Sequence, residues 1–317
     1  MNTIDKISRF SVTLTALASL GALAGCEDND FDPGSRVTGL RVLAQQADNP
    51  YARPGEAIHL TSLSHEPAGR PVTWAWAACV NPDSSSVEGC LEKVARDSET
   101  SGASPLLSMG VDLNSFDYTI PTNALDGFNP DALPLAQVGL VSIACPGELN
   151  FNGTGELPFG CTEAGTGREL GLDEYVVGIK RVYVRNTDRN QNPAVAQILF
   201  DGAAWPADVI QEVDACDTDD NQFDDCSKSL SHKVAAVATP ESFEAGRDEF
   251  GRDFEEQVVA QYYSTEGIFE DEVRVGDDPE TRFVARKNAS GRELTMWFVI
   301  RDDRGGVTWT ERRLRVR

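Results

Sequence analysis

Short runs of alternating side chains, each ended by turn residues, recur along most of this sequence. The clearest closes the chain, where Leu294, Met296, Phe298 and Ile300 alternate with Thr295, Trp297, Val299 and Arg301. The turn 302–306 (Asp-Asp-Arg-Gly-Gly) then leads into a returning run at 307–316. Alternation at period two indicates β-strands, and two such runs around a turn indicate a hairpin.

The same pattern recurs upstream at 37–44, 56–63, 71–79, 112–120, 137–144, 175–185, 194–201, 232–238 and 256–264. Helical periodicity is scarce between these runs. Many short strands with turns between them predict an all-β fold, here two tandem β-sandwich domains. The polar stretch 186–193 is the best boundary, so we expect one sandwich with loop insertions at 36–188 and a second at 193–317.

The N-terminus has the pattern of an export signal. Lys6 and Arg9 precede an apolar run of about 15 residues, shorter than the roughly 20 that a membrane-spanning helix needs. The run ends in Leu-Ala-Gly-Cys at 23–26, which resembles the bacterial lipobox. That resemblance implies cleavage after residue 25, a diacylglycerol on the sulfur of Cys26 and a further acyl chain, such as palmitate, on the new amino terminus. The alternatives are an ordinary secretory signal with a chance cysteine, or a buried apolar helix.

The predicted mature chain begins with an acidic segment, 26–35, that is almost free of apolar residues and is expected to act as a tether. Glu27 follows the lipid-bearing cysteine. An Asp at that place resembles an inner-membrane retention signal, so Glu27 favours the outer membrane. We therefore expect an outer membrane lipoprotein, facing the periplasm or the cell surface, whose first partner is the membrane itself.

The net charge of −23 argues against nucleic acid as a partner, because an acidic surface repels phosphate backbones. Apart from Cys26, six cysteines fall into three local couples: Cys79 with Cys90, Cys145 with Cys161, and Cys216 with Cys226. Export permits disulfides, and closing a loop of this size contributes on the order of 3 kcal/mol. Zinc binding is the rival interpretation, but the sequence has no CxxC and its three histidines are not spaced as ligands.

The acidic loop between Cys216 and Cys226 is the best candidate for a ligand site. Carboxylate and amide oxygens at alternate positions suit a hard cation, so weak Ca²⁺ binding is predicted at Asp217, Asp219, Asn221, Asp224 and Asp225. Gln222 and Lys228 stand where an EF-hand needs Gly and Glu, which excludes that motif. A solvated acidic loop is the alternative. No other cofactor is expected.

A family resemblance follows from strand patterns and turns. The segments 39–44 and 53–56 and the Trp-bearing run 72–76 look like the first domain of two-domain lipoproteins common in myxobacteria and their relatives, and 297–307 looks like the final hairpin of their Ig-like second domain. The resemblance implies an Ig-like fold and an envelope location; that family has no assigned activity. The local cysteine couples depart from the usual Ig inter-sheet disulfide.

No GxSxG, P-loop or HExxH motif is present. We therefore expect a protein that is not an enzyme and has a binding or structural role in the cell envelope, with an envelope protein or a glycan as partner. Two alternatives stay open. One is a calcium-dependent adhesion or carbohydrate-binding module. The other is an envelope hydrolase, which a deep pocket with a carboxylate or a Ser/His pair of shifted pKa would mark.

Overall fold

The computed structural model describes residues 33–102, 104, 106–128, 135–151, 159–187, 189–247, 252–275 and 277–317. The predicted signal peptide, Cys26 and the first residues of the tether lie outside this part of the chain. From Pro33 onward, the described residues form one compact unit.

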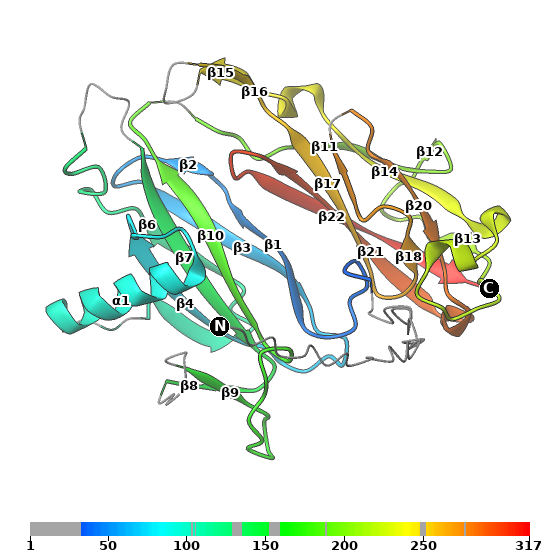
Figure 1. Cartoon of the computed structure of the whole chain (residues 1–317), viewed down its shortest axis with the longest axis horizontal. Helices are drawn as coiled ribbons and strands as arrows, with labels where there is room; N and C mark the ends of the chain where they lie inside the picture. Colours follow the sequence, from blue (N-terminus) through cyan, green and yellow to red (C-terminus); the bar gives the residue numbers. More distant parts are fainter. Residues whose placement is uncertain are drawn as a thin grey trace, which may run out of the picture. The chain divides into compact units, whose positions relative to one another are not determined.

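Residues 41–184 form a first β-sandwich (Figure 1). One of its sheets contains, in spatial order, β1 (Arg41–Ala47), β3 (Ala57–His65) and β6 (Ser115–Thr119). The other contains β2 (Tyr51–Ala52), β10 (Val176–Val184), β7 (Ala136–Cys145), β4 (Thr73–Val80) and β5 (Ser108–Val111). The strand predicted at 112–120 begins only at Ser115, as β6, because Asp112 adopts a positive φ of 54° and turns the chain between β5 and β6.

Residues 195–316 form a second β-sandwich. Its first sheet contains β12 (Ala203–Ala204), β11 (Val195–Phe200), β14 (His232–Ala238), β20 (Glu280–Val284) and β18 (Ile268–Phe269). Its second sheet contains β13 (Gln211–Val213), β22 (Val307–Val316), β21 (Glu293–Asp302), β17 (Val258–Ser264) and β19 (Val273–Val275). The predicted hairpin is β21–β22, which pairs from Glu293–Arg315 to Arg301–Val307.

The two sandwiches share one topology. In each, the first long strand (β1 or β11) lies antiparallel to the next strand of its own sheet, and a short strand then crosses to the opposite sheet. There β2 runs parallel to β10, and β13 runs parallel to β22. Repetition of this strand order confirms the predicted all-β architecture of two immunoglobulin-like sandwiches.

Smaller elements connect these strands. They are the two-stranded ribbons β8 (Glu148–Asn150) with β9 (Gly160–Thr162) and β15 (Ala245–Arg247) with β16 (Asp253–Glu255), and the 3-10 turns η2 (Phe223–Asp225), η3 (Lys228–Leu230), η4 (Pro240–Ser242) and η5 (Lys287–Ala289).

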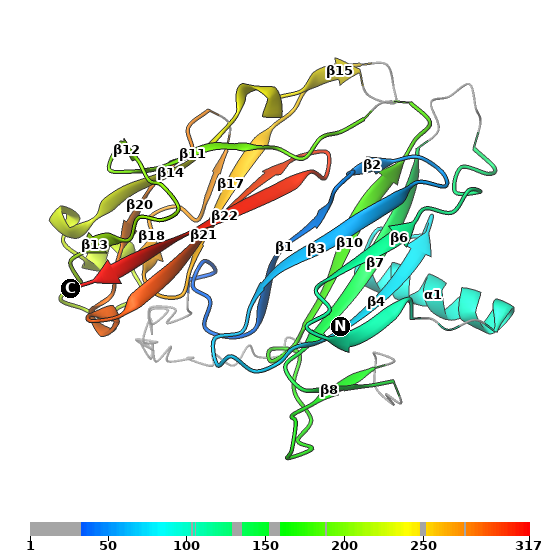
Figure 2. The same cartoon turned by 180° about the vertical axis from the view of Figure 1, so that it is seen from behind.

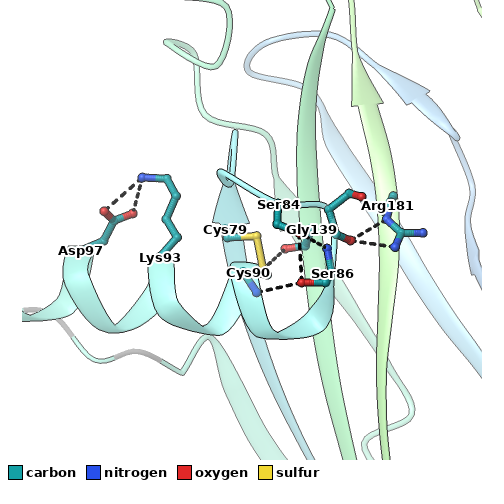
Figure 3. The surroundings of a disulfide bond; sticks show 10 residues. Cys79, Ser84, Ser86, Cys90, Lys93, Asp97, Gly139 and Arg181 are labelled. Atoms are coloured by element: carbon teal, nitrogen blue, oxygen red, sulfur yellow. Dashed lines mark hydrogen bonds and ion pairs between the residues drawn. A yellow bond between two sulfur atoms is a disulfide. The ribbon is translucent and has the colours of Figure 1, made fainter. Parts of the chain in front are cut away.

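One helix, α1 (Val87–Ser101), was not expected from the sequence. The Ser86 hydroxyl caps its first turn by accepting a hydrogen bond from the backbone N–H of Gly89, and Gly102 ends it with φ of 68°. The Cys79–Cys90 disulfide joins the helix to β4 (Figure 3). Its apolar residues Val87, Cys90, Leu91 and Val94 follow the helical i, i+3, i+4, i+7 spacing, a signal that the strand-dominated interpretation overlooked.

Each sandwich has its own apolar core. Leu60, Val138 and Val182 are fully buried between the sheets of the first, and Phe283, Phe298 and Leu314 between the sheets of the second. Four of the five tryptophans, Trp74, Trp76, Trp205 and Trp297, are buried. The side chains of β21 are buried on both faces, because the alternate residues Trp297 and Val299 pack against the first sandwich.

The first described residues lie against the second sandwich, although β1 belongs to the first. The backbone N–H of Val37 donates to the carbonyl of Ser264, and the N–H of Ser264 donates to the carbonyl of Ser35. The N–H and hydroxyl of Ser35 also donate to Oε1 of Glu272. The N-terminal arm, Ser35–Val37, therefore crosses the boundary proposed between the domains, whose limits remain predictions.

Candidate binding groove at the junction of the two sandwiches

The two sandwiches meet through an apolar contact between β1 and β3 on one side and the hairpin β21–β22 with β17 on the other. Leu43 and Leu63 pack with Trp297, and Ala44 packs with Val299 and Val307. The rings of His65 and Trp297 also meet, with centroids 4.8 Å apart. A contact of this composition fixes one sandwich against the other and positions the polar groups around it.

Hydrogen bonds surround this apolar contact. Arg301 donates from Nη2 to the carbonyl of Leu43 at 2.6 Å and from Nε to Oε1 of Gln261 at 2.7 Å. The amide of Gln46 donates to the carbonyl of Val307. Asn192, in the polar connection between the sandwiches, donates to the carbonyl of Ala47 and accepts from the N–H of Val307. The segment predicted to be the domain boundary thus makes direct contacts with both halves.

A cavity of about 470 Å³ opens beside this contact, and we call it the junction groove. Its walls are residues 42–45 of β1, 176–181 and 183 of β10, and the β21–β22 turn at 301–303 and 305. A second cavity, of about 440 Å³, continues along the same two strands and shares Val42, Leu43, Val176 and Val177 with the first.

Lys180 is the most unusual residue of the junction groove. Its position on β10 faces the interior of the first sandwich, as Val182 and Val184 do, and only 7% of its surface is exposed. Its ammonium group donates to the carbonyl of Gly305, and within the described residues no second acceptor bonds to it. The pKa of Lys180 is lowered to about 8, mainly by burial and then by the charge of Arg301, while the charge of Asp302 acts in the opposite direction.

The acidic residues of the junction groove are already engaged by the turn that carries them. Oδ1 of Asp302 accepts hydrogen bonds from the backbone N–H groups of Arg304 and Gly306, and Oδ2 accepts from the amide of Asn190. Oδ1 of Asp303 accepts from the N–H of Gln257. The groove is therefore lined by three positive charges, on Lys180, Arg181 and Arg301, against two negative charges, on Asp302, whose oxygens both accept hydrogen bonds, and on Asp303.

The predicted calcium loop has a different arrangement from the one expected. Asp217, Asp219, Asp224 and Asp225 are exposed. Oδ1 of Asp219 accepts from the N–H of Asn288, and Oδ1 of Asn221 accepts from Arg36. Among the residues that the structure describes, no three His, Cys, Asp or Glu side chains gather as a metal group. The structure thus uses Asp219 and Asn221 to hold the loop to neighbouring segments, and calcium binding remains a sequence prediction without geometric support.

A compact ionic cluster lies next to that loop. The buried carboxylate of Glu266 forms ion pairs with Arg36 at 3.6 Å, Arg286 at 3.3 Å and Arg292 at 3.2 Å. Arg286 also donates to the carbonyl of Asp219. The cluster joins the N-terminal arm, the acidic loop and the second sandwich, which is a structural role.

The three cysteine couples are disulfides in the structure, with Cα–Cα distances of 5.4 Å for Cys79–Cys90, 5.8 Å for Cys145–Cys161 and 5.5 Å for Cys216–Cys226. The pairing is the one predicted from the sequence. Disulfides of this kind belong to proteins that fold outside the cytoplasm. Cys26, the predicted lipid site, lies outside the described residues.

The only helix longer than a single turn in the described segments is α1, and no helix there has the length and apolar character to cross a membrane.

Sequence reasoning missed Lys180 and Arg301 as site residues. The sequence could have revealed Lys180, because alternate residues of the predicted strand at 175–185 lie on the same face. A lysine at 180 shares its face with Val182 and Val184, so it points inward, where a charged side chain needs a partner. The contribution of Arg301 could not be read in this way, because it depends on which strands of the two sandwiches become neighbours.

Comparisons with known proteins leave the function open. No protein-family model and no curated protein matches the sequence. Among solved structures, the chain is similar to murine CEACAM1b (9% identity, 86% of this chain and 100% of that one, TM-score 0.22) and to the tandem Ig repeats of Dlar (8% identity, 88% and 97%, TM-score 0.23). It is also similar to the Yersinia pseudotuberculosis adhesin InvE (9% identity, 87% and 60%, TM-score 0.19). These TM-scores are too low to support a conclusion about fold or function. The Ig-like description of the chain rests on the strand order given above.

Proposed function

We propose that this chain is an exported lipoprotein, anchored through Cys26, whose two-sandwich body binds a partner of the cell envelope at the junction groove. The observation that carries the binding role is the buried ammonium of Lys180, which lines a cavity and bonds to a single carbonyl. A charged group buried with incomplete hydrogen bonding destabilises the folded protein, and an anionic ligand group would complete it. The three disulfides support the export part of the proposal.

Anchoring is tested by fractionation. The lipobox predicts that Cys26→Ser releases the protein from membranes into the soluble fraction, whereas the unchanged chain stays with the membranes after a carbonate wash. A Cys26→Ser protein that remains in washed membranes would contradict the lipid anchor. Mass spectrometry of the N-terminal peptide adds a direct reading of the acyl chains.

Binding at the junction groove is tested by capture from the native envelope with matched variants. Lys180→Met removes the buried charge, and Lys233→Met removes an exposed lysine of β14 in the second sandwich that forms an ion pair with Glu280. We expect Lys233→Met to capture the same envelope partner as the wild type and Lys180→Met to lose it. Equal capture by both variants would show that the groove is not the binding site.

A hydrolase would require a reactive group open to substrate. Glu256 is a buried carboxylate whose pKa is raised to about 7, mainly by burial and then by the charge of Asp302. Its Oε1 pairs with Arg304 at 3.1 Å, and its Oε2 accepts from the N–H of Glu244. Both oxygens are therefore engaged within the protein, so Glu256 is not placed to act on a substrate.

A further inference from the structure

The backbone of β10 has an open edge along the junction groove. The neighbouring strand β2 pairs only with Tyr183 and Val184, so it covers one end of β10 and leaves 176–181 without a strand on that side (Figure 1). The other side of β10 pairs with β7 along its whole length, from Val176 to Val184. The first sandwich therefore has an incomplete sheet beside 176–181, because β1 belongs to the opposite sheet and only the short β2 crosses to pair with β10 (Figure 2).

The orientation of the unpaired groups follows from the strand. The N–H groups of Tyr183 and Arg185 donate to Pro50 and Ala52 on the β2 side. Backbone groups alternate sides along a strand, so the N–H and C=O groups of Val177, Ile179 and Arg181 point toward the same open side. No described residue forms a backbone hydrogen bond with them. Such an edge accepts a further strand.

The space and the charges match an extended segment. The open edge runs from Val176 to Lys180, because Gly305 of the β21–β22 turn lies beside the carbonyl of Arg181. These five residues span about 17 Å at the usual rise per residue of a strand. The junction groove and its continuation, about 470 Å³ and 440 Å³, follow the same stretch of β10. A residue in the added strand whose side chain points inward would lie opposite Lys180, within reach of its ammonium group.

We propose that the junction groove accepts an extended peptide segment of an envelope protein, which adds as a strand to the open edge of β10 and places an Asp or Glu against Lys180. Main-chain hydrogen bonds to Val177 and Ile179 supply affinity, and the acidic side chain supplies selectivity. The inference rests on the proposed binding role and specifies the chemistry of the partner.

The test uses the exported full-length chain in detergent and a labelled synthetic hexapeptide, acetyl-Thr-Val-Asp-Val-Thr-Val-amide, with binding followed by fluorescence anisotropy. Two further peptides carry N-methyl groups on the odd or on the even residues. Because only every second N–H of an added strand faces β10, we expect one methylated set to abolish binding and the other to leave it nearly unchanged. Hydrogen exchange in the fragment containing 176–182 should slow on binding.

The charge is tested by a double-mutant cycle. Replacing the Asp of the peptide with Asn should weaken binding to the wild type about tenfold, as expected for a lost pair between a desolvated ammonium and a carboxylate. The same replacement should leave binding to Lys180→Met nearly unchanged, and Lys233→Met should behave as the wild type. The N-methyl peptides test the strand geometry on the wild-type protein, so the proposal stays falsifiable if Lys180→Met folds poorly.

Equal effects of the two methylated peptides, absence of binding by all peptides, or unchanged exchange at 176–182 would overturn the proposal. A dimer of the free chain that itself slows exchange at 176–182 would also overturn it, because the occupant would then be a second copy. Envelope capture that depends on Lys180 without peptide binding would leave the proposed function standing and reject only the strand addition.

Discussion

Arg301 of β21 donates a hydrogen bond to the main-chain carbonyl of Leu43 on β1, although 258 residues separate them along the chain. The same guanidinium donates to Gln261 on β17. One side chain thus joins an edge strand of the first sandwich to two strands of the second, at the border between the apolar junction and the groove. Loss of this contact should affect the stability of both sandwiches together.

We predict that Arg301→Met lowers the free energy of unfolding by about 2 kcal/mol, because hydrogen bonds from a charged donor contribute about 1.5–3 kcal/mol each and removal of a buried charge offsets part of the loss. Chemical denaturation followed by tryptophan fluorescence measures the change. Arg313→Met, on exposed β22 surface, is the control and should change stability by less than about 0.5 kcal/mol. Equal midpoints for the two variants would contradict the role of Arg301.

The strands and disulfide pairs followed from sequence because they depend on local information. Alternation at 294–301 and the spacing of Cys79 and Cys90 are visible in the sequence alone. The second apolar face of β21 was also visible, since Trp297 and Val299 alternate with the core residues, but which surface covers them depends on tertiary packing. The groove between β1 and β10 was not predictable, because it arises from a strand that changes sheets. The calcium site predicted in the acidic loop gained no support from the structure, because the spacing of Asp219 and Asn221 does not show that their oxygens bond to Asn288 and Arg36.

Gly139 of β7 lies against the Cys79–Cys90 disulfide (Figure 3). A Cβ atom at this position would lie 2.8 Å from Sγ of Cys79 and 3.0 Å from both Sγ of Cys90 and Cδ1 of Ile179. Gly139→Ala should therefore overpack the contact between helix α1 and the sheet, at a cost of about 1–3 kcal/mol.

The control for this prediction is Gly39→Ala, because a Cβ there meets no atom within 4 Å. Thermal melting of the oxidised proteins distinguishes them. A Gly139→Ala protein that melts with the Gly39→Ala control would show that the sheet and the helix adjust without strain.

Oxidised protein should contain only the three local disulfides, 79–90, 145–161 and 216–226. Peptide mapping under non-reducing conditions should recover each couple as a linked pair, and Cys26 should be absent from every bridge. A bridge between cysteines of different couples, or free thiols at these six positions, is the result that rejects the pairing.

The stability of the protein should depend on pH through the buried ammonium group of Lys180. Its pKa in the folded protein is about 8, against 10.5 for an unperturbed lysine, so between these values the unfolded chain binds more protons. Stability contributed by this residue therefore rises with pH from about 8 to 10.5, by an amount on the order of 3 kcal/mol. Urea denaturation at pH 7.5 and 10 should show Lys180→Met more stable than the wild type at pH 7.5, with the difference shrinking at pH 10. Parallel pH profiles for the two proteins would exclude a buried, charged Lys180.

The stability contributed by Glu256 should fall with rising pH, opposite to that of Lys180 and in a lower pH range. Arg304, its partner, lies between two aromatic rings, 4.7 Å from the centroid of Tyr51 and 4.6 Å from that of Phe254, so this ion pair connects the β21–β22 turn to both the first sandwich and the ribbon β15–β16. Burial, and then the charge of Asp302, raise the pKa of Glu256 from 4.5 to about 7. The folded protein therefore binds more protons than the unfolded chain between pH 4.5 and 7, and the stability contributed by Glu256 is fully present below 4.5 and lost as the pH rises through 7.

Denaturation midpoints from pH 4.5 to 7.5 should show the wild type losing stability relative to Glu256→Gln, which cannot titrate, while Glu293→Gln at an exposed site follows the wild type. If Glu256→Gln and the wild type keep a constant difference across that range, the carboxylate is ionised throughout and Arg304 outweighs its burial.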